Sequence, residues 1–274
     1  MNFLARLEHA WQTQQSLLCV GLDPDPARFP EPLKTLAQRD PLAATEQFCM
    51  GIIQATAPYC SAFKPQIAYF ASMRAETVLE KLAVHVRDHF PHHVWLLDAK
   101  RGDIGSTAEH YAREAYERYL ADAVTVSPYM GTDSLAPYLQ FEHRGIFVLC
   151  RTSNPGGDDF QMLSTNHHPL FLEVAQRAAQ SWNKHQQVGL VVGATYPKEI
   201  EAVRHVAKDL PLLIPGIGAQ GGDLVATVKA GKNANGGMLI NSSRAILYAS
   251  SGTDWQDAAA RIAKLTRDDI HTAL

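Results

Sequence analysis

Cysteine and long apolar runs are both scarce in this chain, and each shortage excludes a class of protein. The four cysteines, at positions 19, 49, 60 and 150, form no C-x-x-C pair and no regular framework, so we expect reduced thiols, as in a cytoplasmic protein. No stretch approaches the roughly 18 apolar residues of a membrane span. Residues 1–15 carry charge where a signal peptide has an apolar centre. A soluble cytoplasmic protein without a membrane partner is therefore predicted.

Excess charge, repeats and linkers are also missing. The 25 Lys and Arg residues against 28 Asp and Glu residues leave a net charge of -3, so no basic surface is available to bind a nucleic-acid backbone. Any anionic ligand must be bound by a few local groups. No low-complexity tract, charge block or short repeat divides the sequence, which predicts one domain over residues 1–274.

Eight short runs rich in β-forming residues are present instead, with helical periodicity between most of them, as at 40–59, 106–121 and 223–231. The predicted strands cover residues 16–23, 61–66, 94–100, 123–128, 145–152, 188–195, 211–218 and 236–243. Near-continuous apolar strands indicate burial on both faces, as in a parallel sheet wrapped by helices. Eight β-then-α units favour an α/β fold, the closed (β/α)8 or TIM barrel, with an open doubly wound sheet as the alternative.

Polar or special residues gather at the carboxyl ends of these strands, which meet at one face of a parallel barrel. They are Asp23, Lys64, Asp98, Lys100, Ser127, Thr152, Ser153, Thr195, Gly216, Gly218, Ser243 and Arg244. Residues far apart in the sequence are therefore expected to meet over one pocket at that face.

The stretch LLDAKRGDIGST, residues 96–107, places Asp98, Lys100 and Asp103 within six positions. Because Asp98 and Lys100 are two residues apart on a strand, their side chains are predicted to point to the same side. An ion pair that merely closes a strand is the simpler interpretation. Lys64 on the preceding strand and Asp23 on the one before favour a functional site.

Lys100 has the surroundings of a proton donor. A lysine between carboxylates keeps its proton, because opposite charges close by favour the charged form. It is therefore a poor Schiff-base nucleophile and a good donor to a carbanion formed beside it. The carboxylates orient the ammonium and would repel an incoming substrate carboxylate.

The segment PGIGAQGGD, residues 215–223, follows an apolar strand and leads into a helix, so its backbone N–H groups can cradle a phosphate. Gly216, Gly218 and Gly221 also satisfy G-x-G-x-x-G, but no acidic residue follows at about 20 residues to bind a ribose hydroxyl, which disfavours dinucleotide binding. Arg244 ends the next strand, where such barrels usually bind phosphate. A plain surface arginine is the alternative there.

Taken together, these residues resemble the orotidine 5'-phosphate decarboxylase family. The D-x-K-x-x-D pattern of residues 98–103 is joined by pieces in the family's order: GLD at 21–23, FKP at 63–65, SNPGG at 153–157, PGIGAQGGD at 215–223 and SSRAI at 242–246. The resemblance covers nearly the whole chain and is to the longer bacterial branch. It implies a (β/α)8 barrel that converts orotidine 5'-monophosphate into uridine 5'-monophosphate and carbon dioxide, without cofactor or metal, in pyrimidine biosynthesis.

The resemblance also implies roles for residues near the reacting carbon and the ribose. Lys100 would donate the proton to C6 of the pyrimidine, and Asp98 would face the substrate's own carboxylate. Lys64 would pair with Asp98 and reach the ribose, whose hydroxyls Asp23 would bind. Loss of carbon dioxide leaves electrons on a carbon without an adjacent electron sink, so fixed charge must stabilise them, and Lys100 is the nearest cation.

A second set of residues would bind the rest of the substrate and connect two subunits. Ser153 would hydrogen-bond the pyrimidine edge, while Gln220 and Arg244 would bind the phosphate. Asp103 and Thr107 would reach into the partner's site, so that a homodimer shares its active sites. The Gly-rich loop that carries Ser153 is expected to act as a lid over the base.

Three other functions stay open from the residues alone. A magnesium-dependent relative acting on a sugar-acid phosphate such as 3-keto-gulonate 6-phosphate would share the D-x-K-x-x-D strand, but Lys64 stands where a metal site prefers an acid. A Schiff-base aldolase is disfavoured by the charge on Lys100. A non-catalytic phosphate-sugar binding protein would need Arg244 and the glycine loop, but not Asp98 and Lys100 together.

Other conspicuous residues are predicted to have no part in the chemistry. The histidine pairs at 92–93 and 167–168 lack the i, i+4 spacing of helical metal ligands, so no metal is expected. The tyrosines of segment 106–121 are expected to pack in the protein or at a dimer surface. The acidic pair at 158–159 is expected in a solvated loop.

Overall fold

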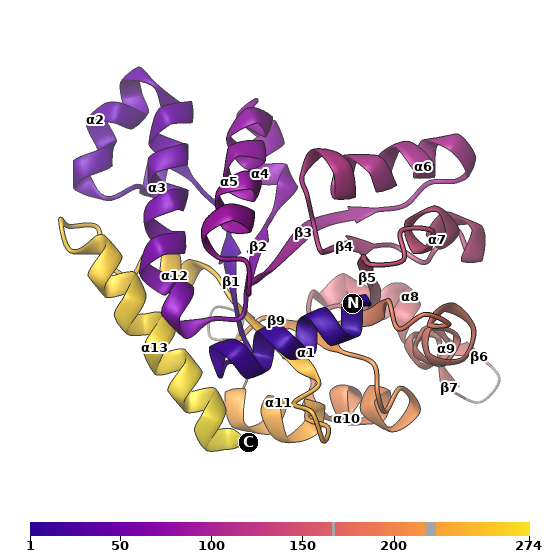
Figure 1. The fold of residues 1–274 in the computed structure, drawn as a ribbon. Coiled ribbons are helices and arrows are strands. Elements are labelled where there is room, and N and C mark those ends of the chain that lie inside the picture. Colours follow the sequence, from indigo (N-terminus) through magenta and orange to yellow (C-terminus); the bar gives the residue numbers. More distant parts are fainter. Residues whose placement is uncertain (166–167, 218–222) are drawn as a thin grey trace.

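Eight parallel strands close into a barrel in the order β1-β10-β9-β8-β5-β4-β3-β2 (Figure 1). The computed structural model describes residues 1–165, 168–217 and 223–274. The barrel strands are β1 (Leu18–Leu22), β2 (Ala62–Pro65), β3 (Val94–Arg101), β4 (Ala123–Val126), β5 (Gly145–Arg151), β8 (Val188–Val192), β9 (Leu212–Pro215) and β10 (Met238–Ser242). A small antiparallel pair, β6 (Ser164–Thr165) and β7 (His168–Pro169), lies outside the ring. The predicted strands and the closed barrel are confirmed, and the open sheet is excluded.

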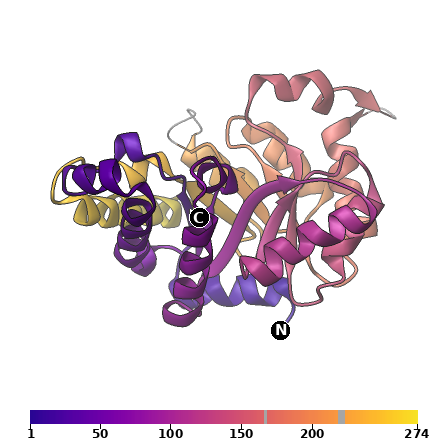
Figure 2. The ribbon, with the colours of Figure 1, turned by 90° about the horizontal axis from the view of Figure 1, so that it is seen from above.

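Helices surround the ring of strands (Figures 1 and 2). The α-helices are α1 (Phe3–Gln14), α2 (Glu31–Arg39), α3 (Pro41–Thr56), α4 (Ile67–Ser72), α5 (Glu76–His89), α6 (Gly105–Arg113), α7 (Thr132–Leu139), α8 (Asp158–Gln161), α9 (Leu170–Arg177), α10 (Pro197–Val206), α11 (Leu224–Gly231), α12 (Arg244–Leu247) and α13 (Trp255–Ala273). Short 3-10 turns are η1 (Pro26–Arg28), η2 (Ala57–Tyr59) and η4 (Pro155–Gly157), and π-helical turns are η3 (Glu114–Arg118) and η5 (Ala178–Trp182). The three predicted helical segments correspond to α3, α6 with η3, and α11.

Helix α3 shows how local sequence sets these boundaries. Asp40 caps its first turn by accepting a hydrogen bond from the N–H of Ala43 at 3.0 Å, and Pro41 occupies the first helical position, where no N–H is needed. Farther along, Phe48 stacks on Trp255 of α13 with ring centroids 5.4 Å apart. Helices α2, α3 and α13 therefore pack together on one side of the ring, as both views show (Figures 1 and 2).

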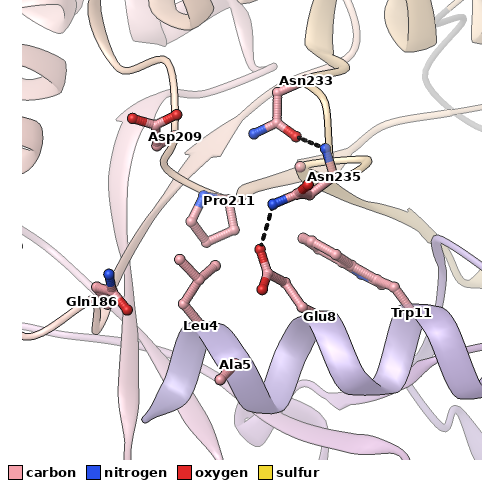
Figure 3. Close-up of a pocket in the computed structure, with 10 residues that line it drawn as sticks. Leu4, Ala5, Glu8, Trp11, Gln186, Asp209, Pro211, Asn233 and Asn235 are labelled. Carbon is pink, nitrogen blue, oxygen red and sulfur yellow. Dashed lines mark hydrogen bonds between the residues drawn. The ribbon is translucent and has the colours of Figure 1, made fainter.

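Helix α1 covers the amino ends of several strands. Phe3 packs edge-on against Phe147 of β5, with centroids 5.9 Å apart, and Gly145 leaves room because a Cβ there would lie 2.2 Å from the Phe3 ring. A hollow of about 300 Å³ lies between α1 and the loops before β8, β9 and β10 (Figure 3). Asn235 donates a hydrogen bond to Glu8 across it at 2.9 Å. This hollow is at the end of the barrel opposite the predicted pocket.

Two strands lose their regular register close to their carboxyl ends. The pairing of β3 with β4 shifts between Leu97 and Arg101, and the pairing of β5 with β8 shifts between Leu149 and Arg151. Such irregularities redirect side chains at the rim of a sheet. Both occur on the face where the polar strand ends gather, and both contribute to the candidate site.

Candidate active site

A buried carboxylate, that of Asp98 on β3, binds two ammonium groups. Lys64 Nζ lies 3.0 Å from Asp98 Oδ2, and Lys100 Nζ lies 2.6 Å from Asp98 Oδ1. The side chains of Lys64 and Asp98 are 5% and 10% exposed, whereas that of Lys100 is 45% exposed. Lys100 is therefore the ammonium group of this array that a ligand can reach.

Asp98 and Lys64 keep their charges over a wide range of pH. Burial alone would raise the pKa of the Asp98 carboxyl, but the charges and hydrogen bonds of Lys64 and Lys100 hold that pKa well below its usual range. Burial also opposes the charge on Lys64, yet Asp98 and Asp23 raise the pKa of its ammonium group well above the usual value. Asp98 thus contributes stability that is present above about pH 4 and lost as pH falls through its folded pKa, while Lys64 contributes stability that is present below about pH 10 and lost as pH rises through its folded pKa.

The backbone bends sharply at Lys100. Its φ of 46° lies in the left-handed region, which is uncommon for residues other than glycine. The side chains of Asp98 and Lys100 do meet, but through this bend rather than through regular strand alternation. The next residue, Arg101, forms a two-pronged ion pair with Glu114 of η3, with N–O distances of 2.9 to 3.1 Å.

Asp23, directly after β1, has one satisfied and one unsatisfied carboxylate oxygen. Ser243 donates a hydrogen bond to Asp23 Oδ2 at 2.7 Å. Gly21 permits this contact, because a Cβ there would lie 2.7 Å from Ser243 Cβ. Asp23 Oδ1 is buried and has no hydrogen-bond partner within the described residues. A buried acceptor of this kind is suited to a hydroxyl group of a ligand.

An arginine at the end of β5 anchors the loop that follows. Arg151 is fully buried. Its Nε lies 2.6 Å from Glu199 Oε2 of α10, and its Nη2 lies 2.6 Å from Asp158 Oδ1 of α8. Gln161 makes two hydrogen bonds with Thr152, each of 2.8 Å: its Oε1 accepts from the N–H of Thr152, and its Nε2 donates to Thr152 Oγ1. Asp158 and Asp159 are exposed, as expected, but they begin the short helix α8 rather than lie in a loop, and Asp158 also neutralises a buried cation.

Ser153 lies on that anchored loop and rests against the end of β8. A Cβ at Gly193 would lie 2.8 Å from both the Cβ and the backbone nitrogen of Ser153. The glycine therefore allows the loop to approach the barrel mouth closely. Ser153 is placed at the carboxyl ends of the strands, as predicted.

The predicted phosphate end is described in part. Gly216 has a φ of 104°, which glycine adopts without strain, and Asp223 caps α11 by accepting from the N–H of Ala226 at 3.0 Å. The predictions for Gly218 and Gln220 lie outside the described residues. Arg244 begins α12 and is exposed, without an ion pair to any described residue.

Asp103 and Thr107 make no hydrogen bond or ion pair with Lys64, Asp98 or Lys100 in the described part of the chain. Asp103 is half-buried, and its Oδ1 accepts a hydrogen bond from the N–H of Ile104 at 2.8 Å. Thr107 is exposed on α6. Asp103 makes no ion pair within the described part of the chain.

The remaining expectations concern packing, metals and membranes. Tyr116 and Tyr119 are buried, so these two pack inside the protein. In the portion of the chain that the structure describes, no three His, Cys, Asp or Glu side chains are grouped to hold a metal ion. Among the same residues, no helix has the length and apolar character needed to cross a bilayer.

Two residues of this face were not singled out from the sequence. Thr125 of β4 contacts both Asp98 and the backbone of Lys100, and Arg151 anchors the loop after β5. The available signal was a polar residue inside an otherwise apolar strand, in AVTVSP and GIFVLCRT respectively. A third polar atom, Asn241 Oδ1 on β10, is buried without a partner among the described residues.

Comparison with known proteins agrees with this geometry. The sequence profile described as "Orotidine 5'-phosphate decarboxylase / HUMPS family" matches residues 16–260. Orotidine 5'-phosphate decarboxylases from Bordetella avium and Ralstonia nicotianae are 63% and 60% identical to the chain over 99% of its length, covering 99% and 98% of their own. The structure of Leishmania donovani OMP decarboxylase superposes with a TM-score of 0.84 at 38% identity, covering 100% of this chain and 98% of that one. The chain therefore belongs to the orotidine 5'-phosphate decarboxylase family.

Proposed function

We propose that this chain converts orotidine 5'-monophosphate into uridine 5'-monophosphate and carbon dioxide, a step of pyrimidine biosynthesis, without metal or cofactor. The observation that carries the proposal is the array of Lys64, Asp98 and Lys100, in which two ammonium groups share one buried carboxylate. Relatives that are 60% and 63% identical and carry the name of this activity support the same substrate. The four buried, free cysteines fit a reducing cytoplasmic location, and residues 1–274 would form one domain.

Lys100 completes the reaction in this proposal. The bond between C6 of the pyrimidine and the carboxylate carbon breaks, and its electron pair stays on C6 as carbon dioxide leaves. The ammonium group of Lys100 stabilises that charge and then transfers a proton, which forms the new C6–H bond. Asp98 holds the ammonium in place and faces the departing carboxylate, while Lys64 neutralises Asp98 from the other side.

The rest of the substrate is bound away from the reacting carbon. The unsatisfied Oδ1 of Asp23 would accept a ribose hydroxyl, and Ser153 would bind the edge of the base. Arg244, exposed and without an ion pair to a described residue, would bind the phosphate together with Gly218 and Gln220. Such remote contacts can supply binding energy that is used at C6.

The direct test follows the change in absorbance of orotidine 5'-monophosphate when purified protein is added in the presence of excess chelator. We expect full turnover in the wild-type protein, because no step requires a metal. Lys100→Ala should bind uridine 5'-monophosphate but lose turnover by at least about 1000-fold, since the stabilising cation and the proton are both removed. Lys81→Ala, at an exposed lysine paired with Glu46, is the matched control and should behave as wild type.

Three results would contradict the proposal. Unchanged substrate absorbance with folded wild-type protein would exclude the reaction and favour a phosphate-sugar binding protein. Turnover that is abolished by chelator and restored by magnesium would point to the metal-dependent relatives. Substantial turnover in Lys100→Ala would show that another group donates the proton.

A homodimer with shared active sites is part of the proposal. Asp103 and Thr107 lie on the β3–α6 connection and the start of α6, beside exposed Ile104. This connection adjoins the β4–α7 loop, because a Cβ at Gly102 would lie 3.9 Å from Met130 Cε. Exposed apolar side chains next to an unpaired carboxylate suit a contact with a second copy, in which Asp103 would reach the partner's Lys100.

Mixing two inactive variants tests this sharing. Asp103→Ala and Lys100→Ala subunits, combined under conditions of verified subunit exchange, should regain activity at the one site of each heterodimer that has both residues. The regained activity should approach about a quarter of wild type, because half of the dimers are mixed and each carries one intact site. No regain, with exchange shown, would mean that each site is built from a single chain.

A further inference from the structure

Thr125, a fully buried residue of β4, uses every hydrogen bond that its hydroxyl can make. Its Oγ1 accepts from the N–H of Ala99 at 3.0 Å and from the N–H of Lys100 at 2.9 Å. The same oxygen lies 2.8 Å from Asp98 Oδ1. A hydroxyl has two lone pairs and one proton, so with both lone pairs occupied its proton must go to Asp98.

These hydrogen bonds take the place of regular pairing between β3 and β4. Leu97 pairs with Val124 and Arg101 with Val126, so three residues of β3 stand opposite Thr125 alone. In this bulge the N–H groups of Ala99 and Lys100 have no carbonyl of β4 opposite them in regular register. The Thr125 side chain supplies the missing acceptor for both, which satisfies two backbone donors next to a left-handed residue.

We infer that Thr125 is a positioning residue for the proton donor, a role that rests on the proposed decarboxylation. Lys100 is held at both ends: its ammonium group by Asp98 at 2.6 Å, and its backbone by Thr125. One hydroxyl thus fixes the strained bend and the carboxylate that orients the ammonium. Because its hydrogen bonds are all used, Thr125 does not bind substrate itself.

The role predicts a specific kinetic pattern. The described hydrogen bonds of the Thr125 hydroxyl go to Asp98, Ala99 and Lys100 and not to Asp23 or Arg244, which would bind the ribose and phosphate. Loss of its hydroxyl should therefore leave substrate binding nearly intact while the reacting geometry at C6 is disturbed. Small displacements of a reacting group lower kcat strongly, so the effect should be on kcat rather than on KM.

The test compares Thr125→Val, which has the same shape but no hydroxyl, with Thr125→Ser, which keeps the hydroxyl. The valine variant should lose about 10- to 100-fold in kcat, with KM and the Kd for uridine 5'-monophosphate within about threefold of wild type. The serine variant should recover most of kcat. The matched control is Thr56→Val, which should keep the wild-type kcat. Thr56 is a buried threonine of α3 whose hydroxyl donates a hydrogen bond to the carbonyl oxygen of Ile52.

The split between kcat and binding separates positioning from general loss of stability. At temperatures where Thr125→Val is folded, kcat should stay low while the Kd for uridine 5'-monophosphate stays near the wild-type value, and Thr125→Ser should restore kcat. A protein that is merely destabilised would regain the wild-type kcat at temperatures where it is folded.

The outcomes are distinct. Wild-type kcat in Thr125→Val, or a serine variant as impaired as the valine variant, overturns the positioning role while leaving the decarboxylation intact. If the valine variant does not fold, a 100-fold loss of kcat in folded Thr125→Ser has the same consequence. A wild-type protein without decarboxylase activity would instead overturn the proposed function, and the positioning role with it.

Discussion

The carboxyl ends of β3 and β5 both interrupt the pairing of the sheet, and both bring basic side chains together with carboxylates. At β3, the groups that bind Asp98 come from three adjacent strands: Lys64 from β2, Lys100 from β3 and Thr125 from β4. At β5, the groups that bind Arg151 come from α8 and α10. The first cluster therefore joins side chains of the barrel strands to one another. The second cluster joins helices outside the strands to the end of a barrel strand.

This difference separates two requirements of a catalytic site. Fixed charges stabilise a developing charge best when they do not reorganise during the reaction, which rigid neighbouring strands provide at β3. A loop over a ligand must instead be attached at one end and free to fit at the other. In the lid expected around Ser153, Arg151 would provide that attachment.

The largest expected effect comes from breaking the β3 cluster. Lys64→Met leaves Asp98 buried with one of its two cations removed, and breaking a buried ion pair in this way costs about 3–5 kcal/mol. We expect that loss in the free energy of urea unfolding. Turnover should also fall by at least about 100-fold, because the orientation of Lys100 depends on Asp98.

The double variant Lys64→Met/Asp98→Leu separates stability from activity. Removing both buried charges leaves no unpaired buried charge, only the Thr125 hydroxyl without its acceptor, so the stability should return to within about 1–2 kcal/mol of wild type while turnover stays lost. A single variant as stable as wild type would show that the cluster is not constrained by the barrel, and the contrast with β5 would fail.

Much of the β3 cluster could be predicted from the sequence, because charges inside an apolar strand are conspicuous. Asp98, Lys100 and Lys64 were recognised for this reason, and parallel strands bring their ends together in any barrel. The bend at Lys100 was not predictable, since a left-handed lysine carries no sequence mark. Thr125 was missed because its one signal, a polar residue inside an apolar strand, is shared by many ordinary threonines, whose β-branched side chains favour strands in general.

The β5 cluster was largely hidden from the sequence. Arg151 pairs with Asp158 only because a 3-10 turn at Pro155–Gly157 brings the chain back, and with Glu199 only because α10 packs beside the strand. Neither contact follows from periodicity or from local spacing. The acidic pair at 158–159 is exposed as expected, but the ion pair of Asp158 with a buried arginine could not be foreseen.

A smaller effect is expected from Arg151→Met. It removes the attachment of the loop and leaves Glu199 without its cation, which should cost about 1–3 kcal/mol of stability. We expect weaker binding of uridine 5'-monophosphate and faster proteolysis near residues 154–163, with a kcat close to wild type because the β3 cluster is untouched. Arg144→Met, which removes an ion pair with Asp122 before β5 begins, is the control and should leave both binding and proteolysis unchanged. A loss of kcat without a change in binding would contradict the division between the two strands.

The smallest effect should come from the outer partner of Arg151. Asp158 and Glu199 lie at the same distance of 2.6 Å, but their side chains are 59% and 19% exposed. Water and salt screen the more exposed pair, so Asp158→Asn should cost less than about 1 kcal/mol and should cost still less at high salt. Glu199→Gln should cost more and depend less on salt, because its pair is better shielded. The measurement is the free energy of urea unfolding of both variants at low and high salt. Equal losses of free energy in the two variants would mean that Asp158 and Glu199 hold Arg151 equally, and that Arg151 is not anchored chiefly to α10.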